Sequence, residues 1–243
     1  MRNTFIFTTA AAIWLCPTSY SQTAPILTRV DTSSDGRATL NVRNDSDTSL
    51  VAFVDVEESH PVASDGKKYK VTAVRWWDVA TDLADQPVAP HHEIGILTGT
   101  PGAPPQATLM AAVFADGSSF GDPAWVQSIM TRRQVMRDGF DLAFSLLEKG
   151  MREGTPRADL ITQLTASKDH YAPKTSLSEE AGWATRYHRM IVHNLTKNIY
   201  DTTGAPISDQ RAMEGVLAHR DRYRDRFELY GVHSAATSHE AAR

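Results

Sequence analysis

The sequence changes its periodicity once, at Gly121-Asp122-Pro123, and this change constrains the fold more than any other feature. Before it, short runs of apolar and β-branched residues are separated by turn clusters such as Asp35-Gly36. After it, apolar residues recur at the three- and four-residue spacing of amphipathic helices. Strands that all precede the helices, without βαβ alternation, indicate an α+β fold.

The strand-like segment 26–120 predicts an N-terminal antiparallel β-sandwich of the immunoglobulin-like kind. Residues 38–43 alternate apolar and polar side chains, and residues 50–56 form a second, more apolar run. Asp116-Gly117 is a strong signal for a two-residue hairpin turn. Five or six short strands, separated by clusters of Gly, Pro, Asn and Asp, are typical of such a sandwich.

The chain after residue 120 predicts about four helices that cap or extend the sandwich. Asp122 is a good N-cap residue, and the proline that follows it suits the first helical position. The first helix is expected to continue to Gly150, with Gly139 as a point where it could kink. The expected helix starts are marked by Pro123, Pro156, Ser176 and Ser208.

The first 21 residues have the order of a cleavable secretory signal peptide. Arg2 supplies positive charge, residues 5–15 are uncharged and mostly apolar, and small residues precede a cut ahead of Gln22. The apolar run is about half of the roughly 20 residues that a membrane span requires. We therefore expect a secreted or periplasmic protein without a membrane span after leader removal. An uncleaved N-terminal anchor and a lipid anchor at Cys16 are the alternatives.

Four segments follow from these boundaries: a signal peptide (1–21), a β-sandwich domain (22–120), a helical region (121–231) and a loose tail (232–243). Cys16 is the only cysteine and lies in the leader, so the mature chain has no disulfide and no thiolate. The formal net charge is −4, with basic residues dispersed among acidic ones. This pattern argues against a nucleic-acid partner, which needs a basic stripe.

Ser119 is the one candidate for a catalytic residue. It is the central serine of residues 117–121, which match the G-x-S-x-G pattern of a nucleophile elbow. An elbow places its serine on a strained turn directly before a helix, with a histidine within reach. Here several residues separate the serine from the first helical turn. A hairpin is therefore the favoured interpretation.

No metal site and no cofactor are predicted. Residues 31–36 resemble the start of a calcium loop, but the position that needs a bidentate glutamate is a valine. His91 and His92 are adjacent on an expected strand, where neighbouring side chains point to opposite faces. Two such imidazoles do not readily share one ion.

Trp76 and Trp77 are the candidates for a binding site. Because adjacent residues on a strand point to opposite faces, one indole is expected in the core and the other outside. The outer indole is either covered by the helices or exposed as an aromatic platform, for example for a sugar ring.

Two stretches resemble parts of uncharacterised secreted bacterial proteins: residues 112–125 (AVFADGSSFGDPAW) and residues 42–46 (VRNDS). In those proteins an immunoglobulin-like sandwich ends in a strand, an Asp-Gly hairpin and a Gly-Asp step into a long helix. The resemblance implies a fold and an exported context, and it implies no catalytic residue.

These observations predict an exported, non-catalytic binding or accessory protein of the cell envelope or exterior. Its partner would be another envelope or extracellular protein, bound through a sheet edge or a groove between the two halves. A serine hydrolase that uses Ser119 and a structural or assembly component of the cell surface are the two alternatives.

Overall fold

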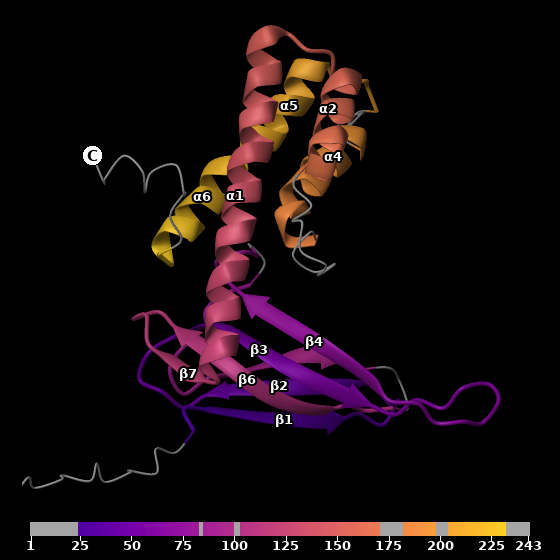
Figure 1. Ribbon diagram of the computed structural model, residues 1–243, viewed down its shortest axis with the longest axis vertical. Helices are drawn as coiled ribbons and strands as arrows, with labels where there is room; N and C mark the ends of the chain where they lie inside the picture. The colour runs from indigo at the N-terminus through magenta and orange to yellow at the C-terminus, as the bar shows by residue number, and fades with distance from the viewer. Residues whose placement is uncertain (1–23, 83–84, 100–102, 171–181, 198–203, 232–243) are drawn as a thin grey trace, which may run out of the picture.

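The computed structural model describes residues 24–82, 85–99, 103–170, 182–197 and 204–231. In these ranges, seven strands in two antiparallel sheets precede five α-helices, which confirms the predicted α+β fold (Figure 1). The predicted signal peptide, the predicted tail and the expected helix start at Ser176 lie outside the described residues.

The first sheet has the strand order β1-β2-β5 and the second has the order β4-β3-β6-β7. The strands are β1 (Ile26–Thr32), β2 (Ala38–Asn44), β3 (Leu50–Ser59), β4 (Val71–Asp78), β5 (Glu93–Thr98), β6 (Gln106–Phe114) and β7 (Ser119–Gly121). The prediction of five or six strands fell one or two short of the seven. The short β7 has only three residues, too few to give a periodic pattern.

Both sheets contribute to one apolar core. Leu40 and Val42 of β2 belong to the same buried cluster as Phe53 of β3 and Trp77 of β4. The alternation predicted for β2 appears as alternating burial along the strand. Strand β3 is instead buried at every residue from Leu50 to Val54, because the second sheet lies between the first sheet and α1.

Helix α1 (Pro123–Glu153) rises from the second sheet and continues into the helical region (Figure 1). Asp122 caps it as predicted, accepting a hydrogen bond from the backbone nitrogen of Ala124 at 2.7 Å. A kink was expected at Gly139, and α1 continues through this position as one helix of 31 residues. A Cβ atom at Gly139 would lie 2.1 Å from the carbonyl oxygen of Ala184, so this glycine permits a close backbone approach.

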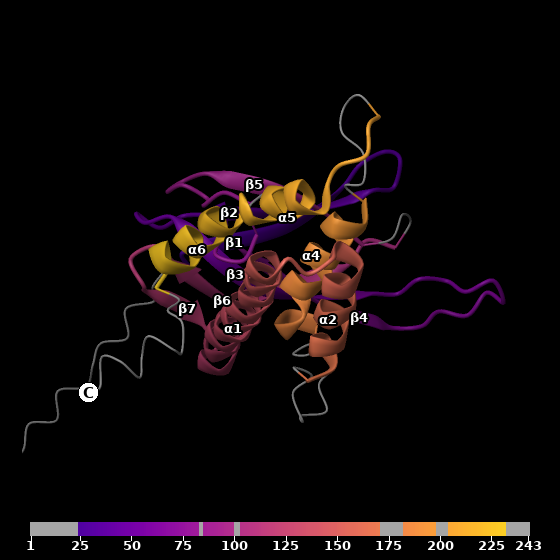
Figure 2. The same ribbon diagram turned by 90° about the horizontal axis from the view of Figure 1, so that it is seen from above.

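The remaining helices pack beside α1, and Figure 2 shows them from above. They are α2 (Arg157–His170), α4 (Arg186–Lys197), α5 (Asp209–Leu217) and α6 (Arg220–Leu229). Helix α5 begins after Ser208 as predicted, and the Ser208 hydroxyl caps it by accepting a hydrogen bond from the backbone nitrogen of Arg211 at 3.3 Å. The expectation of one final helix is wrong, because the chain breaks between α5 and α6 at Ala218-His219. No helix in the described ranges is both long and apolar enough to cross a membrane.

Candidate functional site

A pocket of about 350 Å³ opens at one side of the two sheets. Arg37 from the turn between β1 and β2 lines it, together with Arg75 of β4 and Leu97, Thr98 and Gly99 at the end of β5. The pocket therefore lies where an edge strand of one sheet meets an edge strand of the other. We call it the edge pocket.

Glu57 binds two residues that line the edge pocket, Arg75 and Thr98, and so joins the two sheets. Its carboxylate accepts short hydrogen bonds from the Thr98 hydroxyl on β5 and from Nη2 of Arg75 on β4. Arg75 also donates from Nη1 to the carbonyl oxygen of Leu97 at 3.3 Å. Charge-assisted bonds of this kind, shielded from solvent, fix the spacing of β4 and β5.

Asp55 lies next to this cluster and is completely buried. Its Oδ1 is 3.7 Å from Nε of Arg75, and neither carboxylate oxygen has a hydrogen bond from the described residues. Burial raises the pKa of Asp55 to about 7. The positive charge of Arg75 lowers this pKa in part, and the negative charge of Glu57 raises it further. A carboxyl group in this position changes its protonation near neutral pH.

The buried Asp55 should make stability depend on pH. The pKa of its carboxyl group is about 7 in the folded state against an ordinary value of 3.8, so the folded state retains the proton over this interval. Stability therefore falls as the pH rises from about 4 to 7. We expect Asp55→Asn to remove this loss and to raise the free energy of unfolding above pH 7 by on the order of 2 kcal/mol.

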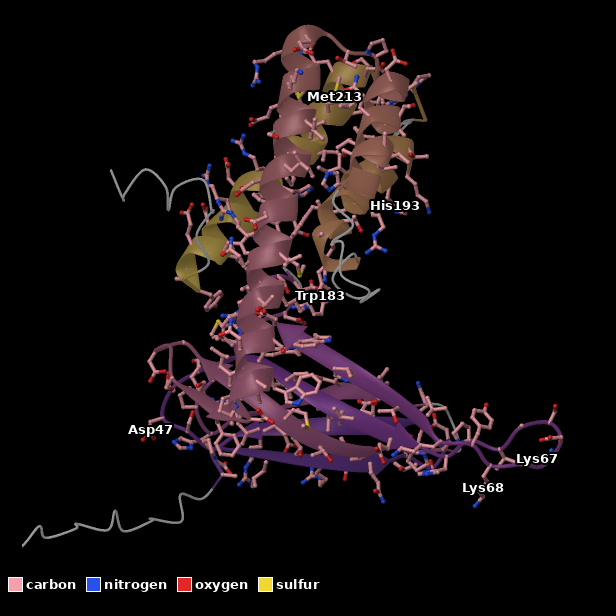
Figure 3. All side chains as sticks on the ribbon, in the orientation of Figure 1. Asp47, Lys67, Lys68, Trp183, His193 and Met213 are labelled. Carbon is pink, nitrogen blue, oxygen red and sulfur yellow. The ribbon has the colours of Figure 1, made fainter. Side chains whose placement is uncertain are left out.

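Urea denaturation of both proteins at a series of pH values measures this effect. The matched control is Asp47→Asn, which changes a fully exposed aspartate at the surface (Figure 3) and should leave the pH profile unchanged. If the stability of the wild type and that of Asp55→Asn changed with pH in the same way, this result would contradict the raised pKa of Asp55.

The connection between β3 and β4 is a long hairpin that extends beyond both sheets (Figure 3). Its two arms are tied by an antiparallel bridge between Val62 and Lys68, and Gly66 turns the chain with φ 79°. Val62 and Tyr69 on this hairpin are 59% and 51% exposed. This β3–β4 hairpin therefore presents apolar side chains to solvent.

The two candidate tryptophans point to opposite sides of the sheet. Trp77 is buried and stacks on Phe53, with ring centroids 5.2 Å apart. Trp76 lies on the other face, where Trp183 packs against it edge-on at 5.3 Å and Trp125 at 5.9 Å. The outer indole, that of Trp76, is therefore half-buried and packed against helical residues rather than open to solvent.

Ser119 is an exposed residue at the start of β7, paired with Val113. The turn before it is the predicted hairpin, in which the backbone nitrogen and hydroxyl of Ser118 both donate to Asp116. Because β7 continues to Gly121, Ser119 does not lie on a turn directly before α1. The local geometry is that of a hairpin strand.

The histidine pair and the calcium-like segment are both in turns. His91 and His92 precede β5 rather than lie on it, and His91 has φ 60°. Residues 33–36 form the turn between β1 and β2, closed by a hydrogen bond from the Ser33 nitrogen to the Arg37 carbonyl oxygen. In the ranges that the structure describes, no group of three or more potential ligands could hold a metal ion.

A buried ion pair, which no pattern in the sequence indicated, connects the sheets to the helices. Asp78 at the end of β4 accepts two hydrogen bonds from Arg133 of α1, both at 2.9 Å, and both side chains are 2% exposed. Arg132 donates to the hydroxyl of Thr81 at 3.1 Å and lies 5.9 Å from the ring of Trp76.

Two further arginines hold the loop that follows β4. Arg226 of α6 donates to the carbonyl oxygens of Val79, Asp82 and Asp85 at 2.9, 2.7 and 2.8 Å. Arg186 of α4 donates to the Asp82 carboxylate at 2.8 Å. The helices and sheets are thus joined through one polar region, which depends on contacts between distant segments and therefore has no local signal in the sequence.

No protein-family model matches the chain, and no curated protein or solved structure is significantly similar to it.

Proposed function

We propose that the chain is an exported, non-catalytic binding or accessory protein of the cell envelope or exterior. The single observation that carries this proposal is the β3–β4 hairpin, which extends from the sheets with Val62 and Tyr69 exposed. Val71, at the start of β4, is 39% exposed, and Leu97 of the neighbouring β5 is 69% exposed. We take the side of the protein that carries this hairpin as the contact surface, because exposed large apolar side chains are typical of such surfaces.

The proposed partner is another protein that packs against this side. In the described part of the chain, β4 and β5 are both edge strands, and an edge strand has backbone groups that another strand can pair with. The antiparallel three-stranded and four-stranded sheets support our further proposal of an immunoglobulin-like sandwich, a frequent architecture of cell-surface domains. The proposal of export rests on the leader sequence.

Affinity capture from native cell envelopes tests the proposal, with the chain from Gln22 onward as bait. We expect the wild type to retain one stable partner. The double variant Val62→Glu/Tyr69→Glu should weaken that complex at least about tenfold, because each substitution places a charge in an apolar contact.

The matched control is Leu229→Glu on α6, where the leucine is 72% exposed and far from the hairpin in sequence. This variant should bind the partner as the wild type does. Equal binding by the hairpin variant, or the absence of any partner, would contradict the proposal. Self-assembly of the bait into ordered polymers would favour a structural component of the cell surface instead.

A further inference from the structure

A second pocket, of about 330 Å³, lies between α2 and α4 in the helical region. Leu164 of α2 and Val192 of α4 supply apolar walls, and the almost completely buried ring of His188 borders the same space. Burial lowers the pKa of His188, so this wall is polar but uncharged at neutral pH. We call this pocket the α2–α4 groove.

The sequence of α4 explains how the groove is built. Tyr187, Ile191 and Leu195 recur every four residues and are buried in the helical core. The next stripe, one residue further on, is formed by His188, Val192 and Thr196, and it lines the groove. A single helix therefore presents one face to the core and the adjacent face to the pocket.

A third stripe on α4 forms the rim of the groove. Arg189, His193 and Lys197 are spaced by four residues, are exposed, and all line the pocket. Figure 3 shows His193 on the outer side of the helical region, away from α1. Basic residues at this spacing are neighbours on a helix surface and repel one another when charged.

The charge of the groove has one sign. No acidic side chain from the described residues lines it. Arg189 donates from Nη2 to the carbonyl oxygen of Gly182 at 2.8 Å, a contact that leaves its charge unneutralised. An anion above this stripe would relieve the repulsion between the basic side chains, and the apolar walls below would favour a hydrocarbon chain.

We propose that the α2–α4 groove binds a small anionic amphiphile, an acyl chain whose carboxylate or phosphate head pairs with Arg189, His193 and Lys197. The volume lies at the lower end of the roughly 300–1,000 Å³ found for small-molecule pockets. A peptide helix, with a diameter of about 10–12 Å, requires more room. The basic rim and the apolar walls of the groove therefore fit a short acyl chain with a negatively charged head.

Isothermal titration with ten-carbon probes tests the proposal. We expect saturable, one-to-one binding of decanoate or decyl phosphate, and the tighter of the two identifies the head group. Decanol should bind at least about tenfold more weakly, because it lacks the charge that the basic stripe recognises. Decylamine should not bind. Equal affinity for decanol and decanoate, or no saturable binding of either anion, would overturn the proposal.

Two variants locate the site. Arg189→Glu/Lys197→Glu changes only exposed side chains, and it should weaken binding of the anionic probe by at least about tenfold. Val192→Trp keeps the charges but fills the groove, so it should abolish binding of the probe. The control, Lys149→Glu/Arg152→Glu, makes the same charge change on exposed residues of α1. An equal loss of affinity in the control would show that net charge, and not the groove, binds the probe.

Discussion

Asp78→Ala is expected to lower the free energy of unfolding by about 3–5 kcal/mol, because it removes one partner of a buried ion pair. The substitution leaves the guanidinium of Arg133 buried without its carboxylate, and it removes the acceptor of the Ala80 backbone nitrogen, now at 3.0 Å. Burying an unpaired charge is the main cost. Urea denaturation of the wild type and the variant measures the change.

The control for this prediction is Asp221→Ala on α6. Asp221 also contacts two arginines, Arg220 at 3.1 Å and Arg224 at 3.3 Å, but its side chain is 59% exposed. Exposed ion pairs contribute little, so the control should change stability by no more than about 0.5 kcal/mol. If both alanine variants lost the same small amount of unfolding free energy, this result would show that the buried ion pair does not stabilise the connection between sheets and helices.

Gly139→Ala is expected to be the second severe change, with a loss of about 3 kcal/mol or more, because the added methyl group has no space. Its carbon would lie 2.1 Å from the Ala184 carbonyl oxygen and 2.9 Å from the carbonyl carbon, and backbone atoms cannot move aside as a flexible side chain can. The segment before α4 would have to separate from α1. Thermal and urea unfolding measure the loss.

Gly215→Ala on α5 is the matched control, because this glycine is also inside a helix. A methyl group added to it would meet no atom within 4 Å beyond its chain neighbours and the backbone of its own helix. Alanine has the higher helix propensity, so this variant should gain about 0.5–1 kcal/mol. The two substitutions are chemically identical, and they should change the free energy of unfolding in opposite directions. A gain in stability for Gly139→Ala would contradict the close contact between α1 and Ala184.

Local signals in the sequence were sufficient to predict the order of strands and helices along the chain. The turn at Asp116-Gly117, the N-cap at Asp122 and the N-cap at Ser208 act within a few residues, so each could be identified without knowledge of the fold. The break between α5 and α6 was missed, because apolar spacing continues through it as far as Phe227. Breaks of this kind depend on where the helix must pack.

The candidate site was harder to predict, because its residues come together from distant parts of the chain. Asp55 and Arg75 are on neighbouring strands, but Thr98 belongs to the other sheet. Trp76 was expected either to be covered or to be exposed, and only the positions of Trp125 and Trp183 decided between these possibilities. Sequence periodicity gives the face of a strand but not what covers that face.

By itself, the sequence determined that strands precede helices, where the hairpin before β7 turns, and where α1 begins, because short-range backbone preferences and side-chain caps control these features. Only the tertiary structure decided that Gly139 serves a close backbone contact, that Arg133 is buried against Asp78, and that basic residues of α4 border a groove. These features depend on desolvation and contact between segments far apart in the chain, and such long-range effects leave no local pattern.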